Sequence, residues 1–304
     1  MVGAPITKCR KRFCRRTVNS MTKVDQFESV FKSAAKTICA FEKIEIARIL
    51  VLTDKDVDGA AAFADRSRAL LRVLASDSGI TWRTVEGDAF FDVGSLLELV
   101  DEVQPDLICT YRHLHSDGWK WPFSLGAYLD ILLQQTPIPV VVLPHPDQAG
   151  ETREPGTLSV MAVTDHLPGD DRLFSMSACL TEPEGTLHLV HVEDEGAFQR
   201  FMDIISKISS IDTDQARDEI RNRMMKEPRD YVTGCRAVMV ENGFRCQVEE
   251  TITMGRQLST FKNLLAQHAV DLLVMNTKDH DQLAMHGLAY PLAVELRETP
   301  LLML

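Results

Sequence analysis

The chain contains one pattern of hydrophobic segments twice. In each copy an apolar run ending in Thr-Asp is followed by a run that begins with Asp-Leu and then by a run that begins with Pro. The paired segments are 49–54 and 158–165, 106–109 and 271–275, and 139–143 and 300–304. Gly126 and Gly287 each precede the Pro of the closing run by thirteen residues. Internal repetition indicates two tandem copies of one structural unit.

Length and composition narrow the class of protein. A chain of 304 residues with 45% hydrophobic residues suits about two globular domains. The net charge of -11 argues against nucleic acid as a main partner, because phosphate binding requires a basic surface. Seven cysteines without paired spacing are typical of reduced thiols, and no apolar stretch approaches the ~20 residues of a membrane span. We therefore expect a cytoplasmic protein without membrane insertion.

Residues 1–24 depart from this acidic balance. Six Lys and Arg residues lie within positions 8–16, and no acidic residue precedes Asp25. A block of like charges repels itself and stays extended, as in an arm that contacts nucleic acid or a membrane surface. The alternative is a disordered extension that results from an upstream start codon, with Met21 as the true first residue. We interpret 1–24 as a basic, disordered extension.

The first unit, 25–145, is predicted to alternate helices and strands. Apolar residues at three- and four-residue spacing predict an amphipathic helix over Asp25–Lys43. Asp56 or Asp58 is the expected cap of the next helix, and Pro122 suits a first helical position. Strands are expected near 48–53, 81–85, 107–110 and 139–143, with helices near 58–75, 92–103 and 122–134.

The second unit, 157–304, follows a linker rich in Pro, Gly and charge at 144–156. Its expected strands lie near 158–164, 186–192, 245–251, 271–275 and 301–304. A long helical region, Glu195–Glu241, is expected to break at Pro228. Strands that alternate with helices predict a mostly parallel sheet covered by helices on both faces.

The two units differ in length. Asp54 and Asp106 are 52 residues apart, whereas Asp165 and Asp271 are 106 apart. The difference matches one strand with its helical crossover, and we assign the missing element to the second strand of the first unit. A bare sheet edge would result, and we expect the Asp25–Lys43 helix to cover it.

The second unit resembles a universal stress protein, a member of the adenine-nucleotide-binding, Rossmann-like α/β group with five parallel strands. The resemblance rests on Val163-Thr164-Asp165, on the strand-like runs 187–192 and 271–275, and on the run that begins at Pro300. The first unit is similar to a shortened copy. Members of this family pair through their fifth strands, so the resemblance implies an intramolecular pseudo-dimer with Val140–Leu143 antiparallel to Leu301–Leu304, and allows a homo-oligomer.

The resemblance also implies a nucleoside site. In this family the acid after the first strand contacts the nucleoside, and a Gly-x-x-Gly-x9-Gly-Ser/Thr motif after the fourth strand wraps the phosphates, where backbone N–H groups approach the anion. The candidate site residues are Asp165, Val192, Asn276, Thr277 and Gly287. In the first unit, Asp54 corresponds to Asp165 and Gly126 corresponds to Gly287.

The phosphate motif is incomplete in both units. Ala127 and Leu288 replace the hydroxyl residue that follows the final glycine, and the two leading glycines are absent. Asp279 and Asp281 lie where a triphosphate would be repelled. We therefore expect that AMP or ATP binds weakly or not at all.

Four histidines lie in loops where a metal site could form. His113, His115, His280 and His286 lie in the two equivalent loops, but no Cys or carboxylate set completes a site, so we predict surface histidines and no metal. His188 and His191 are three residues apart on a predicted strand and face opposite sides of it, with at least one packed in the sheet.

The remaining features favour a protein that acts by binding. Trp119 and Trp121 flank Lys120 and either anchor a partner or fold back onto the sheet end. No arrangement of nucleophile and base is recognisable, so we predict no enzyme activity. The resemblance implies a stress-associated regulatory protein with an unidentified protein partner, a transporter being one possibility. The alternative is an AMP/ATP sensor that binds through the second unit.

Overall fold

The computed structural model describes residues 39–76, 79–121, 123–148, 156–164, 167–277 and 288–304. The first half contains strands β1 (Arg48–Leu52), β2 (Thr81–Val85), β3 (Leu107–Tyr111) and β4 (Val140–Leu143), with helices α2 (Val57–Leu70), α3 (Val93–Val103) and α4 (Ala127–Gln135). The second half contains strands β5 (Ser159–Val163), β6 (Thr186–Asp194), β7 (Gln247–Gly255), β8 (Leu272–Met275) and β9 (Leu301–Met303), with helices α5 (Asp171–Leu180), α6 (Glu195–Ile205), α7 (Thr213–Glu241), α8 (Gln257–Gln267) and α9 (Ala289–Glu295).

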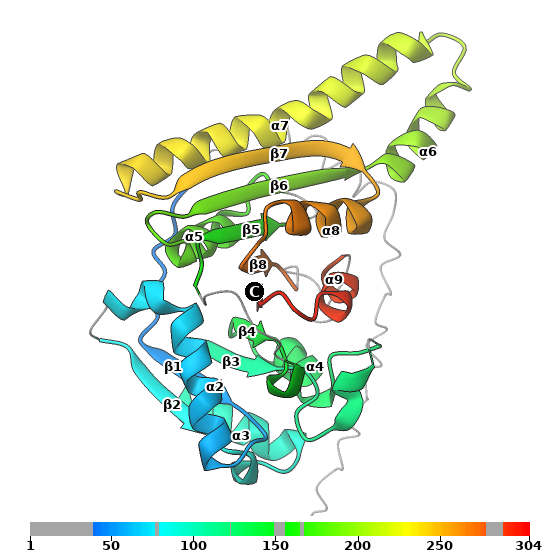
Figure 1. Ribbon diagram of the computed structural model, residues 1–304. Helices are drawn as coiled ribbons and strands as arrows, with labels where there is room; N and C mark the ends of the chain where they lie inside the picture. Colours follow the sequence, from blue (N-terminus) through cyan, green and yellow to red (C-terminus); the bar gives the residue numbers. More distant parts are fainter. Residues whose placement is uncertain (1–38, 77–78, 122, 149–155, 165–166, 278–287) are drawn as a thin grey trace, which may run out of the picture. The chain divides into compact units, whose positions relative to one another are not determined.

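The two halves share one nine-stranded sheet in the order β2-β1-β3-β4-β9-β8-β5-β6-β7 (Figure 1). Every neighbouring pair is parallel except β4 and β9, which run antiparallel with Val141 opposite Leu302. The expected pairing of the two Pro-led runs is therefore confirmed. The predicted α/β class and the mostly parallel sheet are also confirmed.

The sheet order corrects the position of the missing strand. β2 lies beside β1 just as β6 lies beside β5, whereas β7 has no counterpart among the described residues of the first half. The first unit thus lacks the third strand of the repeat, not the second as predicted from the spacing. β2 is consequently an edge strand, with Arg83 exposed and paired to Glu102 at 3.0 Å. A charged side chain on an edge strand disfavours pairing with another chain.

The aspartate that begins each Asp-Leu run has the same structural role in both halves. The Oδ2 atom of Asp106 accepts hydrogen bonds from the backbone N–H groups of Ala47 (2.9 Å) and Arg48 (2.8 Å). The Oδ2 atom of Asp271 accepts one from the N–H group of Ser159 at 2.9 Å. Each aspartate therefore connects the start of the first strand of its half to the strand that follows the aspartate.

Two helix predictions are wrong in detail. α7 continues through Pro228, although an internal proline removes a helical hydrogen bond. Pro228 and the following Tyr231 and Val232 are buried, so tertiary packing outweighs the local preference. α4 begins at Ala127, directly after Gly126, whereas a start at Pro122 was predicted; Pro122 itself lies outside the described residues.

The predicted Asp25–Lys43 helix can be checked only at its end, because residues 25–38 lie outside the described residues. Residues 39–43 are not helical. The Phe41 ring packs edge-on against Phe244 with centroids 5.3 Å apart, and the N–H group of Glu42 donates to Ser175 Oγ at 2.9 Å. This short segment therefore packs on the second half. The prediction that it covers the first half is wrong for Phe41.

Candidate functional site

The candidate crevices lie where the strand order reverses. In a doubly wound sheet, ligands bind outside the carboxyl ends of the strands at such a switch point. The reversal falls between β1 and β3 in the first half and between β5 and β8 in the second. The side chains just after these strands therefore decide what each crevice can bind.

In the first half, the groups of Asp54 are engaged by the protein itself. One carboxylate oxygen accepts a hydrogen bond from the Tyr111 hydroxyl, and the other accepts one from the N–H group of His115 at 2.8 Å. The N–H group of Asp54 donates to the Tyr111 hydroxyl at 3.0 Å, and Thr53 Oγ1 lies 2.7 Å from the same hydroxyl. Burial, assisted by the hydrogen bond to Asp54, raises the pKa of Tyr111. The acid expected to face a nucleoside instead joins the ends of β1 and β3.

Gly126 is required by packing in the first half. Its φ of 92° is in the left-handed region, and a Cβ atom would lie 2.8 Å from His113 Cα. His113 is buried, so its prediction as a surface histidine is wrong, whereas His115 is exposed as expected. Burial lowers the pKa of His113. The matching glycine thus makes room for the neighbouring loop.

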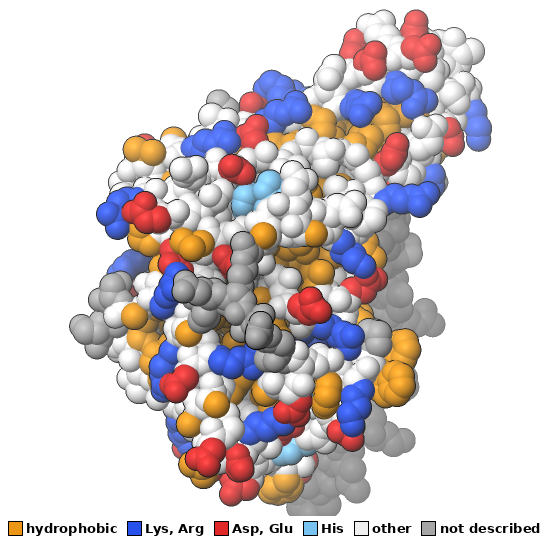
Figure 2. Space-filling model, viewed as in Figure 1, with side chains coloured by type: hydrophobic (Ala, Val, Ile, Leu, Met, Phe, Trp, Pro, Cys, Tyr) orange, Lys and Arg blue, Asp and Glu red, His pale blue; other side chains and the backbone are white. Residues whose placement is uncertain are grey.

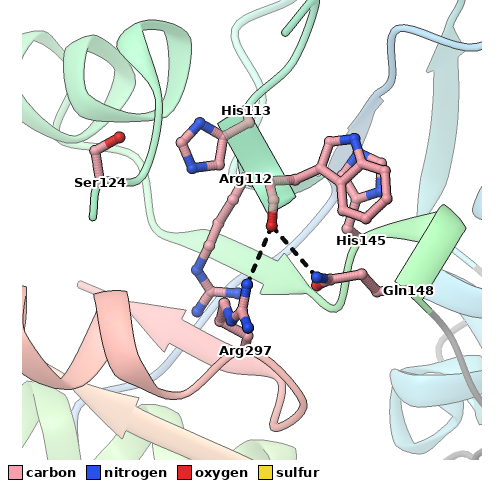
Figure 3. A pocket seen from close by; sticks show the side chains of 7 residues that line it. Arg112, His113, Ser124, His145, Gln148 and Arg297 are labelled. Atoms are coloured by element: carbon pink, nitrogen blue, oxygen red, sulfur yellow. Dashed lines mark hydrogen bonds between the residues drawn. The ribbon is translucent and has the colours of Figure 1, made fainter. Parts of the chain in front are cut away.

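A small pocket lies beside this loop (Figure 3). Trp119 stacks on His145 with centroids 4.6 Å apart, and its carbonyl oxygen accepts hydrogen bonds from Arg297 Nη1 (3.1 Å) and Gln148 Nε2 (3.3 Å). The cavity volume is about 10 Å³, which is the space of one water molecule. The pocket is lined by Arg112, His113, Trp119, Ser124, His145, Gln148 and Arg297. A nucleotide does not fit in it.

The two tryptophans have different environments. Trp119 folds back over His145, and burial lowers the pKa of His145 to about 4, so this ring is neutral at physiological pH. Trp121 has 63% of its surface exposed. Folding back is therefore observed for Trp119, whereas a role of Trp121 as a partner anchor stays a prediction.

In the second half, the structure describes three of the five candidate residues. Val192 is buried, and its carbonyl oxygen accepts a hydrogen bond from Gln257 Nε2 at 2.9 Å. Asn276 Nδ2 donates to Asp170 Oδ2. Both the N–H group (2.9 Å) and the Oγ1 atom (2.6 Å) of Thr277 donate to the carbonyl oxygen of Leu304. Asp165 and Gly287 lie outside the described residues, as do Asp279 and Asp281.

These three residues flank β5 at its carboxyl end. Val192 lies on β6 and Asn276 and Thr277 follow β8, and both strands pair with β5. Their polar groups are bonded within the protein by partners that the sequence analysis missed. Asp170 could have been recognised from the sequence as a helix cap, because its side chain accepts a hydrogen bond from the N–H group of Leu173 at the start of α5 (3.2 Å). No sequence pattern pointed to Gln257.

The other histidine predictions have mixed outcomes. His188 and His191 are both buried in β6, so the prediction of at least one packed strand histidine is confirmed. His191 Nε2 lies 2.9 Å from Glu193 Oε1. Within the described residues, the group of side chains close enough to hold a metal ion includes neither His113 nor His115. His280 and His286 are outside the described residues.

Comparisons with known proteins extend to the fold alone. No protein family and no curated protein matches the sequence. A solved structure of a functionally unknown protein from Pseudomonas aeruginosa PAO1 is 15% identical, with a TM-score of 0.42 over 94% of this chain and 89% of that one. A putative universal stress protein from P. aeruginosa UCBPP-PA14 is 16% identical (TM-score 0.48; 85% and 93% covered). A universal stress protein from Archaeoglobus fulgidus DSM 4304 is 14% identical (TM-score 0.45; 85% of each chain).

Among the residues that the structure describes, no helix is both long and apolar enough to cross a bilayer.

Proposed function

We propose that this chain is a non-catalytic regulatory protein, similar to a tandem universal stress protein, which acts by binding a protein partner. The observation that carries the proposal is that the described polar groups beside both candidate crevices are engaged in hydrogen bonds within the protein. Asp54 is bonded to Tyr111 and His115, and the Val192 carbonyl oxygen is bonded to Gln257. A nucleotide would have to break these bonds and replace them. Each broken bond to a buried group costs about 1–3 kcal/mol unless the ligand restores it.

Two of the described thiols, those of Cys109 and Cys179, are poor candidates for a catalytic nucleophile. A cysteine nucleophile acts as the thiolate. Burial raises the pKa of Cys109 to about 12 and that of Cys179 to about 11, so both are neutral thiols at physiological pH. These described cysteines are therefore unsuited to nucleophilic catalysis.

An exposed apolar surface supports the proposal that the chain binds a protein partner. Exposed hydrophobic side chains occur on α6 and on the segment that joins it to α7. Figure 2 shows hydrophobic surface between α6 and α7. Phe201 and Ile204 are 52% and 62% exposed, and Ile208 and Ile211 are also exposed. Contiguous exposed apolar surface on a folded protein marks an interaction site. We name these four residues the α6 patch.

The nucleotide part of the proposal can be tested by titration calorimetry of the full chain with ATP and AMP. We expect binding no tighter than about 1 mM, or about -4 kcal/mol, because the crevice groups are engaged within the protein. Asp165→Ala should leave the heat signal unchanged. Micromolar ATP binding that Asp165→Ala abolishes would contradict the proposal and support the alternative, an AMP/ATP sensor in the second half.

The partner part requires a comparison of matched variants. Phe201→Ser combined with Ile204→Ser should leave thermal stability unchanged, because both side chains are exposed, but should remove the proteins that wild type retains in an affinity purification from its source cells. Val240→Ser is the control, since Val240 is 78% exposed on α7 and is not part of the α6 patch. A set of retained proteins that is the same for wild type and both variants would exclude the α6 patch as the binding surface.

A further inference from the structure

Three potential metal ligands converge at the amino end of the sheet in the second half. His188 lies on β6 opposite Glu249 on β7, and His268 directly follows α8. The Nδ1 atoms of His188 and His268 lie 3.3 Å and 3.9 Å from Glu249 Oε2. One ligand atom from each residue lies within 4.8 Å of the others. This cluster, here the His188 cluster, is at the opposite end of the strands from the candidate crevices.

The Ser159 hydroxyl lies between the His268 carbonyl oxygen and the His188 ring. Ser159 Oγ donates its hydrogen to the carbonyl oxygen of His268 at 3.1 Å. The same Oγ atom lies 3.3 Å from His188 Nε2. When the hydroxyl hydrogen is directed to the His268 carbonyl, Oγ accepts a hydrogen bond from Nε2, and in this tautomer Nδ1 of the neutral His188 ring carries a lone pair.

This arrangement leaves an unfavourable contact at the centre of the cluster. Only 5% of the His188 surface is exposed, and its Nδ1 atom is buried without a hydrogen-bond partner. That lone pair faces the Glu249 carboxylate, which accepts hydrogen bonds and donates none. A proton or a metal ion between the two atoms would remove the repulsion.

We propose that the His188 cluster binds a zinc ion through His188 Nδ1, His268 Nδ1 and a carboxylate oxygen of Glu249. Two histidines and one carboxylate are an established ligand set for Zn²⁺, with a fourth position open to water. With Zn–N and Zn–O distances of about 2.0–2.2 Å, tetrahedral ligands lie about 3.3–3.5 Å apart. The 3.3 Å separation fits this directly, and the 3.9 Å separation closes by rotation of the Glu249 side chain, which is 54% exposed.

The surroundings of the cluster match those of a metal site. A histidine ligand donates its second ring N–H to a neighbouring acceptor, which fixes the ring orientation. Ser159 performs this role for His188 and is itself held by its bond to the His268 carbonyl. The ion would join β6, β7 and the end of α8, and its open side would face solvent next to Glu249.

The test is a competition titration of chelator-stripped, full-length protein with Zn²⁺ in the presence of a chromophoric chelator. We expect one zinc equivalent that is lost in Glu249→Gln and in His268→Ala, and an affinity about 10–100-fold lower in Ser159→Ala. Zinc should raise the melting temperature of wild type but not of Glu249→Gln, because an ion that binds only the folded state stabilises it. Co²⁺ should give the absorption bands of a tetrahedral site in wild type.

Glu250→Gln is the matched control. Glu250 is the next residue of β7 and pairs with Arg236 at 3.0 Å, so the change removes the same charge beside the cluster without removing a ligand. This variant should keep the zinc equivalent. Glu249→Gln preserves the shape of the side chain, so the variant should fold, and a loss of zinc binding can be attributed to the lost ligand. Absence of the equivalent from wild type, or its retention in both Glu249→Gln and His268→Ala, would overturn the proposal.

Discussion

Deletion of Pro300–Leu304 should make the protein insoluble. β9 lies in the interior of the sheet between β4 and β8, and Leu301, Leu302 and Met303 are all buried. Burial of such side chains contributes roughly 1.5–3 kcal/mol each. Their joint loss approaches the whole stability of an ordinary domain, about 5–15 kcal/mol. The deletion would also leave β4 and β8 as two unpaired hydrophobic edges, which promote aggregation. Solubility after expression and size-exclusion chromatography measure this outcome.

The contribution of β9 to the free energy of unfolding can be measured with a single substitution. Leu302 lies opposite Val141 on one side and Val274 on the other. Leu302→Ala should lower the free energy of unfolding by about 2–5 kcal/mol, because the buried cavity cannot collapse inside the sheet. Leu158→Ala is the control for the same chemical change, since Leu158 precedes β5 and is 46% exposed. It should alter stability by about 0.5 kcal/mol or less. Urea unfolding followed by circular dichroism decides between them, and equal losses would show that β9 has no special role.

Replacement of Arg112 should have the second large effect. Arg112 is buried at the end of β3, and its guanidinium donates to the carbonyl oxygens of Ala293 (2.8 and 3.0 Å) and Leu296 (2.7 Å) at the end of α9. A cation at a helix carboxyl terminus is favourable, and these carbonyl oxygens have no following turn to donate to them. Arg112→Met should cost about 2–4 kcal/mol in the free energy of unfolding, because buried acceptors are left unpaired.

Two further variants separate this interaction from a general effect of charge. Arg112→Lys keeps the charge but cannot donate to two carbonyl oxygens with a planar fork, so its stability should lie between those of wild type and Arg112→Met. Arg297→Met removes a less buried neighbour whose bond to the Trp119 carbonyl oxygen is 3.1 Å long, and should cost less than about 1 kcal/mol. Wild-type stability of Arg112→Met in urea would contradict the assignment of Arg112 as a link between the halves.

The fold was predictable to a large extent because its strands are continuous apolar runs. The strands lie within four residues of their predicted positions, and the antiparallel pairing of β4 with β9 was expected from the repeat and the family resemblance. The errors have local causes. Pro228 lies in a helix held by buried neighbours, and the spacing between Asp54 and Asp106 shows that a strand is missing without showing which one.

The candidate site was less predictable because its hydrogen bonds join distant segments. Tyr111 lies 57 residues from Asp54, and Gln257 lies 65 residues from Val192. No local pattern announces such partners. His188 was recognised as a strand histidine, but its proximity to Glu249 and His268 depends on the register of β6 with β7 and on the end of α8.

The central position of β9 also affects how the protein is made. Leu301 follows Leu143 by more than 150 residues, so at a synthesis rate of about 5–20 residues per second the edge of β4 waits roughly 8–32 seconds for its partner. During that interval the nascent first half exposes a strand of four consecutive hydrophobic residues, Val140–Leu143. The ribosome-bound chain should therefore depend on chaperones that shield hydrophobic strands until β9 has emerged.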